Sequence, residues 1–181
     1  MIIDINNCIG KRKIKPEIYA DKLVEAMDKA GIDKAVIFCF APLMDNASIA
    51  SAVKKYPKRF IGLYTANPWL DDAYIMLRQA LENGFSGLRL DPVRHGYAIN
   101  EIDLLQPLLE ICQEKDVPVW AYGAAEVFSS PILFQELAET YPRINFIMGH
   151  MGYSYEVTSA IGVAQRNPNV FLDVTGNMFI N

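Results

Sequence analysis

The sequence lacks long hydrophobic runs and blocks of like charge. Its longest apolar stretches, such as residues 35–40, are far too short to span a bilayer. Seventeen basic and 21 acidic residues leave a formal charge of −4. Because these charges are interspersed, they form neither a nucleic-acid footprint nor a polybasic membrane patch. We therefore expect no nucleic-acid or membrane partner, while small neutral or anionic ligands stay open.

Cysteine is scarce, and the spacing of the cysteines shows no paired motif. Cys8, Cys39 and Cys112 lie far apart, and no CxxC motif occurs. This argues against a disulfide framework or a structural zinc site and favours a reducing compartment. The first hydrophobic segment contains Asp4 and precedes the basic residues 11–13, which is the reverse of the order in a signal peptide. We expect a soluble, cytoplasmic protein.

Linkers and low-complexity segments are also missing. No Pro/Gly/Ser-rich stretch or shift of composition divides the 181 residues, of which 51% are hydrophobic. A chain of this length and composition can bury a sizeable core. We expect residues 1–181 to form a single domain.

What is present is a regular alternation of strand and helix patterns. Pro16, Ser130 and Ser154 are expected to mark helix starts, as first-turn or N-cap residues. The predicted strands cover residues 2–6, 35–40, 60–66, 87–90, 117–122, 144–148 and 170–174, and the predicted helices cover 16–30, 46–56, 72–83, 104–112, 130–141 and 154–164. Such alternation is typical of a mainly parallel α/β sheet, either closed as a (β/α)8 barrel or open and doubly wound.

Polar residues collect after the predicted strands. In a parallel barrel the loops at the carboxyl ends of the strands carry the chemistry. The polar residues at these positions are Asp4, Asn6, Cys8, Asn67, Arg89, Asp91, Arg94, His95, Tyr122, Glu126, His150, Asp173, Thr175 and Asn177. Both histidines of the chain are among them, and histidine is the side chain best suited to exchange protons near neutral pH.

The two histidines differ in setting. His150 lies between Gly149 and Gly152, which allow close backbone approach, so we favour a functional role over a satisfied structural histidine. His95 follows the strand in a longer loop, where a role in the site and a solvated surface position are equally open.

Arg89 and Asp91 share strand parity, so both can point inward. There the arginine would suit a substrate carboxylate, or the two would form an ion pair closing the barrel mouth. Cys8 is a nucleophile candidate, but a buried thiol acting as a small hydrophobe is the commoner outcome. Asp4 is expected to bond backbone groups near its strand end.

Six segments together resemble one known family. They are residues 31–36 (GIDKAV), 56–62 (YPKRFIG), 84–90 (GFSGLRL), 141–146 (YPRINF), 149–152 (GHMG) and 167–173 (NPNVFLD). Their order and spacing resemble the amidohydrolase-related family of TIM-barrel metal-dependent hydrolases, the branch that includes aminocarboxymuconate-semialdehyde decarboxylase.

The resemblance implies a TIM-type (β/α) barrel with one metal ion, usually zinc. Its ligands would be an HxH pair after strand one, a histidine after strand five and an aspartate after strand eight, with a strand-six histidine as acid/base. Here Asn6 and Cys8 occupy the HxH positions and Tyr122 the strand-five position, whereas His150 matches the acid/base. Strand eight would follow residue 181, so we expect an incomplete, seven-strand barrel, either truncated at its C-terminus or closed by a partner element.

Two functions follow as hypotheses. The first is a hydrolase or non-oxidative decarboxylase acting on a small carboxylated substrate, with His150 and Asn6 catalytic and with no ordinary zinc site, although zinc or another divalent metal stays open. Its substrate-binding residues would be Arg89, Asp91, Arg94, His95 and Tyr122. The alternative is a catalytically degenerate barrel that binds a ligand or partner. In either case a homo-oligomer is open.

Overall fold

The computed structural model describes residues 1–11, 16–124 and 126–176. Its strands are β1 (Ile3–Cys8), β2 (Lys34–Phe38), β3 (Phe60–Gly62), β4 (Tyr64–Thr65), β5 (Leu88–Leu90), β6 (Val119–Tyr122), β7 (Phe146–Gly149) and β8 (Val170–Leu172). Its helices are α1 (Ala20–Ala30), α2 (Asn46–Lys55), α3 (Ala73–Glu82), α4 (Pro92–His95), α5 (Ile102–Glu114), α6 (Leu133–Thr140), η1 (His150–Gly152) and α7 (Val157–Arg166).

The strands follow one another around a curved parallel sheet. Pairing runs β1-β2-β3 and β4-β5-β6-β7-β8, all parallel. β3 and β4 are halves of one predicted strand: Leu63 N–H bonds Ile37 O on one side, and Tyr64 N–H bonds Gly87 O on the other, at 2.9 Å each. The seven predicted strand positions are therefore confirmed. The segment 60–66 pairs with β2 through β3 and with β5 through β4, and it changes partner at Leu63.

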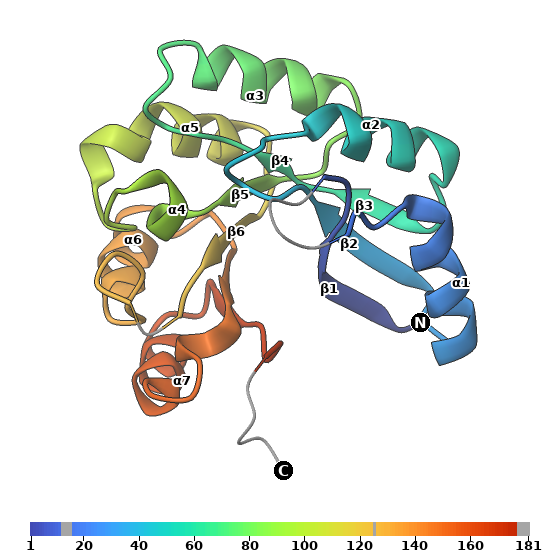
Figure 1. Ribbon diagram of the computed structural model, residues 1–181. Coiled ribbons are helices and arrows are strands. Elements are labelled where there is room, and N and C mark those ends of the chain that lie inside the picture. The colour runs from blue at the N-terminus through green and yellow to red at the C-terminus, as the bar shows by residue number, and fades with distance from the viewer. Residues whose placement is uncertain (12–15, 125, 177–181) are drawn as a thin grey trace.

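Helices cover the outer, convex face of the strands, as Figure 1 shows. Alternate strand residues explain the two cores. Leu88 and Leu90 face the helices in the main core, whereas Arg89 between them faces the barrel interior. A small apolar cluster fills that interior, formed by Val36, Phe38, Leu63 and Trp120. This is the layered arrangement of a TIM-type barrel.

Three predicted helix starts are wrong. The first helix begins at Ala20 rather than at Pro16, because Ile18 forms an antiparallel bridge with Gly10 that keeps the preceding chain extended. The next misplaced helix begins at Leu133, since the Ser130 hydroxyl donates to Glu156 instead of capping its own helix.

The last misplaced helix begins at Val157 with Glu156, not Ser154, at the cap position. The short helices α4 and η1 follow β5 and β7 directly and were not predicted, since each is about one turn long. Asp4 behaves as expected: its carboxylate accepts the Asn6 N–H at 3.2 Å, beside a bulge in β1.

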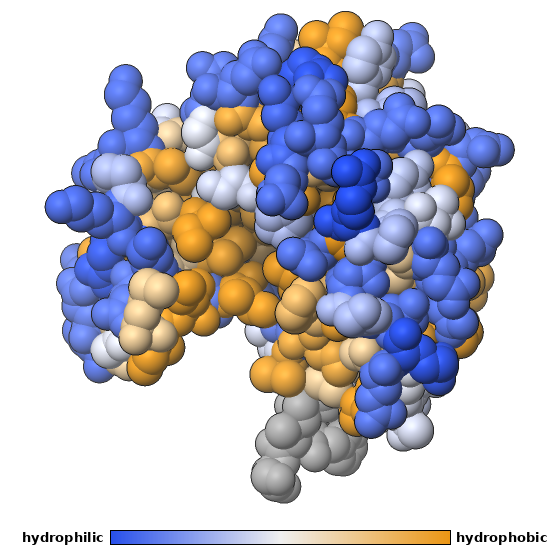
Figure 2. Space-filling view, turned by 180° about the vertical axis from the view of Figure 1, so that it is seen from behind, coloured by the Kyte–Doolittle hydropathy of each residue, from blue (hydrophilic) through white to orange (hydrophobic). Residues whose placement is uncertain are grey.

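The outer edges of β1 and β8 face one another across a seam. Within the described ranges no strand pairs with either edge. Phe171, in the middle of β8, is consequently 51% exposed, and Ile3 of β1 is exposed as well. Seen from behind, apolar surface lines a hollow between the two flanks of the molecule (Figure 2). None of the described helices is long and apolar enough to cross a membrane.

Candidate functional site

Arg89 lies inside the barrel against two aromatic rings. Its guanidinium carbon is 4.7 Å from the Phe38 ring centre and 5.3 Å from that of Trp120, and the side chain is almost fully buried. The two rings contact each other with centres 4.9 Å apart. A cation is thus held in an apolar interior by ring faces, which attract it electrostatically.

Asp91 anchors two arginines. Its buried carboxylate accepts Arg89 Nη2 at 2.7 Å and Arg94 Nη1 at 3.0 Å, and it also accepts the Arg94 N–H as the cap of α4. The predicted ion pair at the barrel mouth is therefore present. Because both oxygens of Asp91 accept these bonds, the carboxylate holds the arginines in place.

Two nitrogens of the Arg89 guanidinium do not bond to Asp91. Nε and Nη1 are buried and have no hydrogen-bond partner in the structure. Burying a donor of a charged group without a partner costs free energy, and such groups in native proteins call for an explanation. Nε and Nη1 point to opposite sides of the guanidinium, so each can donate to an acceptor of its own, such as one oxygen of a substrate carboxylate.

His150 sits on the other side of the β6 aromatic residues. Its ring lies 5.0 Å from Tyr122, 6.1 Å from Trp120 and 5.6 Å from Tyr153, centre to centre, each in an edge-on arrangement. Tyr122 also contacts the Arg94 guanidinium at 5.4 Å. Trp120 and Tyr122 therefore connect the two arginines to the histidine.

The backbone at His150 is unusual. His150, Met151 and Tyr153 have φ values of 65°, 35° and 53°, in the left-handed region that favours glycine. Such strain costs on the order of 1–3 kcal/mol per residue and concentrates at functional sites. A Cβ on Gly149 would collide with the Trp120 ring, so the predicted close approach at this glycine is real.

The protonation form of His150 follows from its partner. Nδ1 lies 2.8 Å from the carbonyl oxygen of Thr175. A carbonyl only accepts, so Nδ1 carries the proton and Nε2 of the neutral ring keeps its lone pair. Nε2 is therefore the atom available to take up a proton.

A cavity of about 280 Å³ opens beside these residues. It is lined by Tyr122, Ala124, Glu126, Tyr153 and Tyr155. Burial raises the pKa of the Tyr122 phenol, and nearby Glu126 adds to the shift, so this hydroxyl stays protonated at neutral pH. The site thus offers aromatic faces and neutral hydroxyls next to His150.

His95 is not a solvated surface residue. Both ring nitrogens are buried, and burial lowers the pKa of the imidazole, although the charge of Asp91 opposes the shift. Its backbone oxygen accepts the Trp69 indole N–H at 2.9 Å. His95 therefore belongs to the wall behind the arginines, and its predicted contact with substrate stays a prediction.

Asn6 points across the seam. Its Nδ2 donates to Asp173 Oδ2 at 2.6 Å, and Asp173 is 2% exposed. The sequence placed Asp173 among the polar residues at strand ends but gave it no role, and the aromatic residues Phe38, Trp120 and Tyr153 were not among the predicted site residues. Strand parity could have found Trp120, since it lies two positions before Tyr122 on β6.

The donors at the expected metal positions do not fit a zinc shell. Asn6 donates its Nδ2 to Asp173, and Tyr122 offers a phenol where the family has an imidazole. Among the residues that the structure describes, no three His, Cys, Asp or Glu side chains cluster closely enough to hold a metal ion. Catalytic zinc sites use three such ligands.

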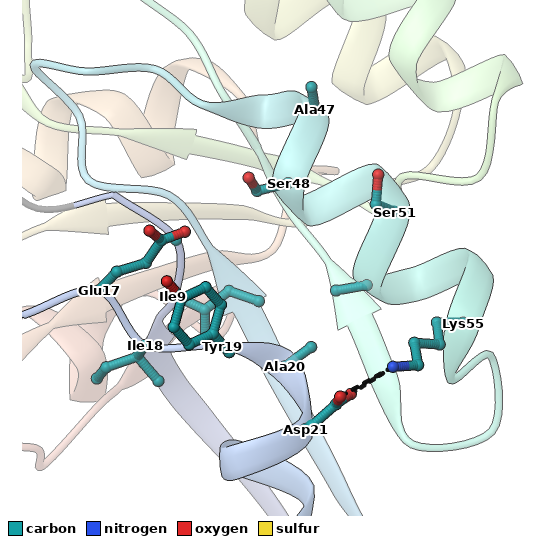
Figure 3. A pocket seen from close by; sticks show the side chains of 12 residues that line it. Ile9, Glu17, Ile18, Tyr19, Ala20, Asp21, Ala47, Ser48, Ser51 and Lys55 are labelled. Atoms are coloured by element: carbon teal, nitrogen blue, oxygen red, sulfur yellow. Dashed lines mark hydrogen bonds and ion pairs between the residues drawn. The ribbon is translucent and has the colours of Figure 1, made fainter.

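A separate cavity of about 390 Å³ lies between α1 and α2, away from the histidine and arginines. Tyr19, Ser48 and Ser51 are among its lining residues, and Asp21 pairs with Lys55 at 2.7 Å along its rim (Figure 3). Neither of the two histidines is among its lining residues. The candidate site is therefore the barrel mouth.

The sequence profile of the amidohydrolase family matches residues 11–179. The chain belongs to the amidohydrolase family. A comparison with curated protein sequences gave no match. The family and the barrel fold expected from the sequence motifs are thereby confirmed.

Solved structures similar to this amidohydrolase include an uncharacterised TIM-barrel protein from Bordetella bronchiseptica, with a TM-score of 0.78 and 18% identity over 96% of this chain and 74% of that one. A "probable 2-pyrone-4,6-dicarboxylic acid hydrolase" from Acinetobacter baumannii with citric acid bound has a TM-score of 0.76 and 14% identity, over 97% of this chain and 70% of that one. A 2,6-dihydroxybenzoate decarboxylase complexed with 2,6-dihydroxybenzoate has a TM-score of 0.67 and 16% identity, over 83% of this chain and 66% of that one. At these identities the likeness concerns the fold.

Proposed function

We propose that this amidohydrolase is an enzyme that hydrolyses or non-oxidatively decarboxylates a small carboxylated substrate without an ordinary zinc site. His150 transfers the proton, Arg89 and Arg94 bind a carboxylate, and Tyr122 supplies an aromatic wall. His95 completes the wall behind the arginines, and Asn6 stays a candidate for orienting substrate or water.

The observation that carries the proposal is the pair of unpartnered donors on Arg89. Its Nε and Nη1 are buried, and Asp91 holds the third nitrogen. A bound carboxylate would accept from one of these donors and reduce the cost of burying an unsatisfied charged group. The same contact would fix the substrate relative to His150, because Trp120 touches both side chains.

For hydrolysis His150 would transfer the proton in both steps. Nε2 of His150 would take a proton from water as the water oxygen bonds to the substrate's carbonyl carbon. As the bond from this carbon to the leaving oxygen breaks, the imidazolium would return the proton to that oxygen. For decarboxylation the C–C bond to a carboxylate breaks, CO2 leaves, and protonated His150 would deliver its proton to the carbon.

The arginines favour binding a carboxylate that is retained. An ion pair to the departing carboxylate would stabilise the ground state and be lost as neutral CO2 forms, which slows the reaction. The Arg89 site therefore suits hydrolysis of a carboxylated ester or lactone, or decarboxylation of a substrate with a second acidic group. The similar structures that hold citric acid and 2,6-dihydroxybenzoate, both carboxylates, support the broader class of small carboxylated substrates.

The test is a screen of small carboxylated lactones, esters and aromatic acids with purified protein, with and without EDTA. We expect turnover that EDTA leaves intact and that His150→Ala abolishes. Cys8→Ser is the matched control, since Cys8 is a half-buried thiol at the same mouth without a role in the proposal.

Two outcomes would contradict the proposal. Turnover that depends on added zinc would refute the metal-independent reaction. Saturable binding of a carboxylate without any product would instead identify a binding protein built on a degenerate barrel.

A further inference from the structure

The main chain that contacts His150 has little support of its own. Val174, Thr175 and Gly176 are exposed and follow the last strand, yet the Thr175 carbonyl accepts the His150 Nδ1 proton. A carbonyl on an exposed turn orients a ring only if something fixes the turn.

Asp173 is what fixes it. Its Oδ1 accepts the Thr175 N–H at 2.9 Å, closing an Asx-type turn, and its own N–H donates to Met148 O on β7 at 3.0 Å. Thr175, whose carbonyl contacts His150, is thus held through its own N–H by a carboxylate that is buried although the three following residues are exposed.

Both oxygens of Asp173 are used, and by neutral groups. Asn6 from β1 donates to Oδ2, and Thr175 donates to Oδ1. Within the described part of the chain no ion pair reaches this carboxylate. A buried carboxylate held without a cation is costly, so its presence beside a strained histidine calls for a reason.

We propose that Asp173, held by its bond to Asn6, is a positioning residue that keeps the His150 proton on Nδ1 by fixing the main chain of Thr175. Asp173 touches no substrate and acts only through the main chain. The inference rests on the proposed function for its catalytic meaning, because Nε2 is left as the proton acceptor, but the tautomer itself is measurable without any substrate.

The experiment is long-range ¹H–¹⁵N NMR of the imidazoles in the full chain at a pH where they are neutral. The chain has two histidines, and a His95→Gln variant assigns the signals. We expect His150 to be in the Nδ1–H form. Asp173→Ala should lower the ratio of Nδ1–H to Nε2–H by about fivefold, the factor that corresponds to losing one hydrogen bond of roughly 1 kcal/mol.

A pair of variants at one position isolates the main chain. Thr175→Pro removes the N–H that Asp173 accepts and keeps the carbonyl, so it should shift the tautomer as Asp173→Ala does. Thr175→Ala keeps both main-chain bonds and should leave the ratio unchanged. Thr175→Pro decides the question if Asp173→Ala fails to fold.

An Nε2–H form in the unaltered protein, or an Nδ1–H ratio that survives both Asp173→Ala and Thr175→Pro, would overturn the inference. With a substrate from the screen, Asp173→Ala should lower kcat and leave KM unchanged, because the arginines are untouched. A protein without turnover would end the proposed function while the NMR result stands.

Discussion

The two flanks of the barrel mouth differ in chemistry. β5 to β8 and their following loops bring Arg89, Arg94, Tyr122 and His150, all polar or charged, whereas the inward residues of β1 and β2 include Ile5, Cys8, Val36 and Phe38. The flank formed by β1 and β2, here called the first flank, supplies an apolar wall, and its Phe38 ring stacks against the Arg89 guanidinium. The flank formed by β5 to β8 is called the second flank.

The difference shows that reactive groups and apolar walls in this barrel are divided by position along the chain. Asn6 is the exception, since it comes from the first flank and reaches Asp173 on the second. Changes on the second flank should therefore alter chemistry, and changes on the first should alter packing alone.

The largest effect is expected at His150. His150→Ala should lower kcat by about 10²- to 10⁴-fold, the usual contribution of a general acid or base. Cys8→Ser on the opposite flank should change kcat by less than about twofold, since a half-buried thiol there serves packing. Steady-state kinetics on both variants measures the contrast, and equal losses would erase the distinction between the flanks.

Asp91→Ala should cause the next largest effect, a loss of stability. Removing the carboxylate leaves the Arg89 guanidinium buried without an anion, which typically costs about 3–5 kcal/mol. Urea unfolding measures the loss. The control is Asp21→Ala, which breaks an exposed pair with Lys55 outside the barrel and should leave the unfolding midpoint nearly unchanged.

Arg89→Met should act on substrate binding. The apolar side chain keeps the contacts with Phe38 and Trp120 but removes the charged donors, so KM should rise by about 10- to 150-fold, equivalent to roughly 1.5–3 kcal/mol. Arg89→Lys should not restore KM, because an ammonium lacks the rigid planar guanidinium that can bond Asp91 and a substrate oxygen at the same time. An unchanged KM would remove Arg89 from the binding site.

The last effect concerns the Cys39 thiol, which is buried in the main core. Burial raises the pKa of Cys39 to about 11. Folded protein should therefore keep this thiol protonated while unfolded chains ionise near pH 9, so the free energy of unfolding should fall as the pH rises from about 9 to 11. Cys39→Ala should flatten this dependence, as measured by urea midpoints across the range; an unaltered slope would assign it to other groups.

Much of the fold was predictable because alternating apolar segments specify buried parallel strands and their covering helices. The starts of α1 and α6 were not predictable, because the Gly10–Ile18 bridge and the Ser130–Glu156 bond are tertiary contacts that local propensity does not contain. In the site, parity placed Arg89 and Asp91 inward correctly. The role of Asp173 was hidden because it depends on a residue 167 positions away.

The Asn6–Asp173 bond has a mechanical consequence. The arc of described strands is a split ring, and the Asn6–Asp173 side-chain bond joins its two ends at the rim where His150 lies. In a barrel whose strands are hydrogen-bonded all around, local opening is distributed over many strand pairs. Here it concentrates at the gap between β1 and β8, where local opening costs the least free energy. Hydrogen exchange should accordingly be fastest along β1 and β8. The distance between the ends of these two strands should vary as the Asn6–Asp173 bond forms and breaks.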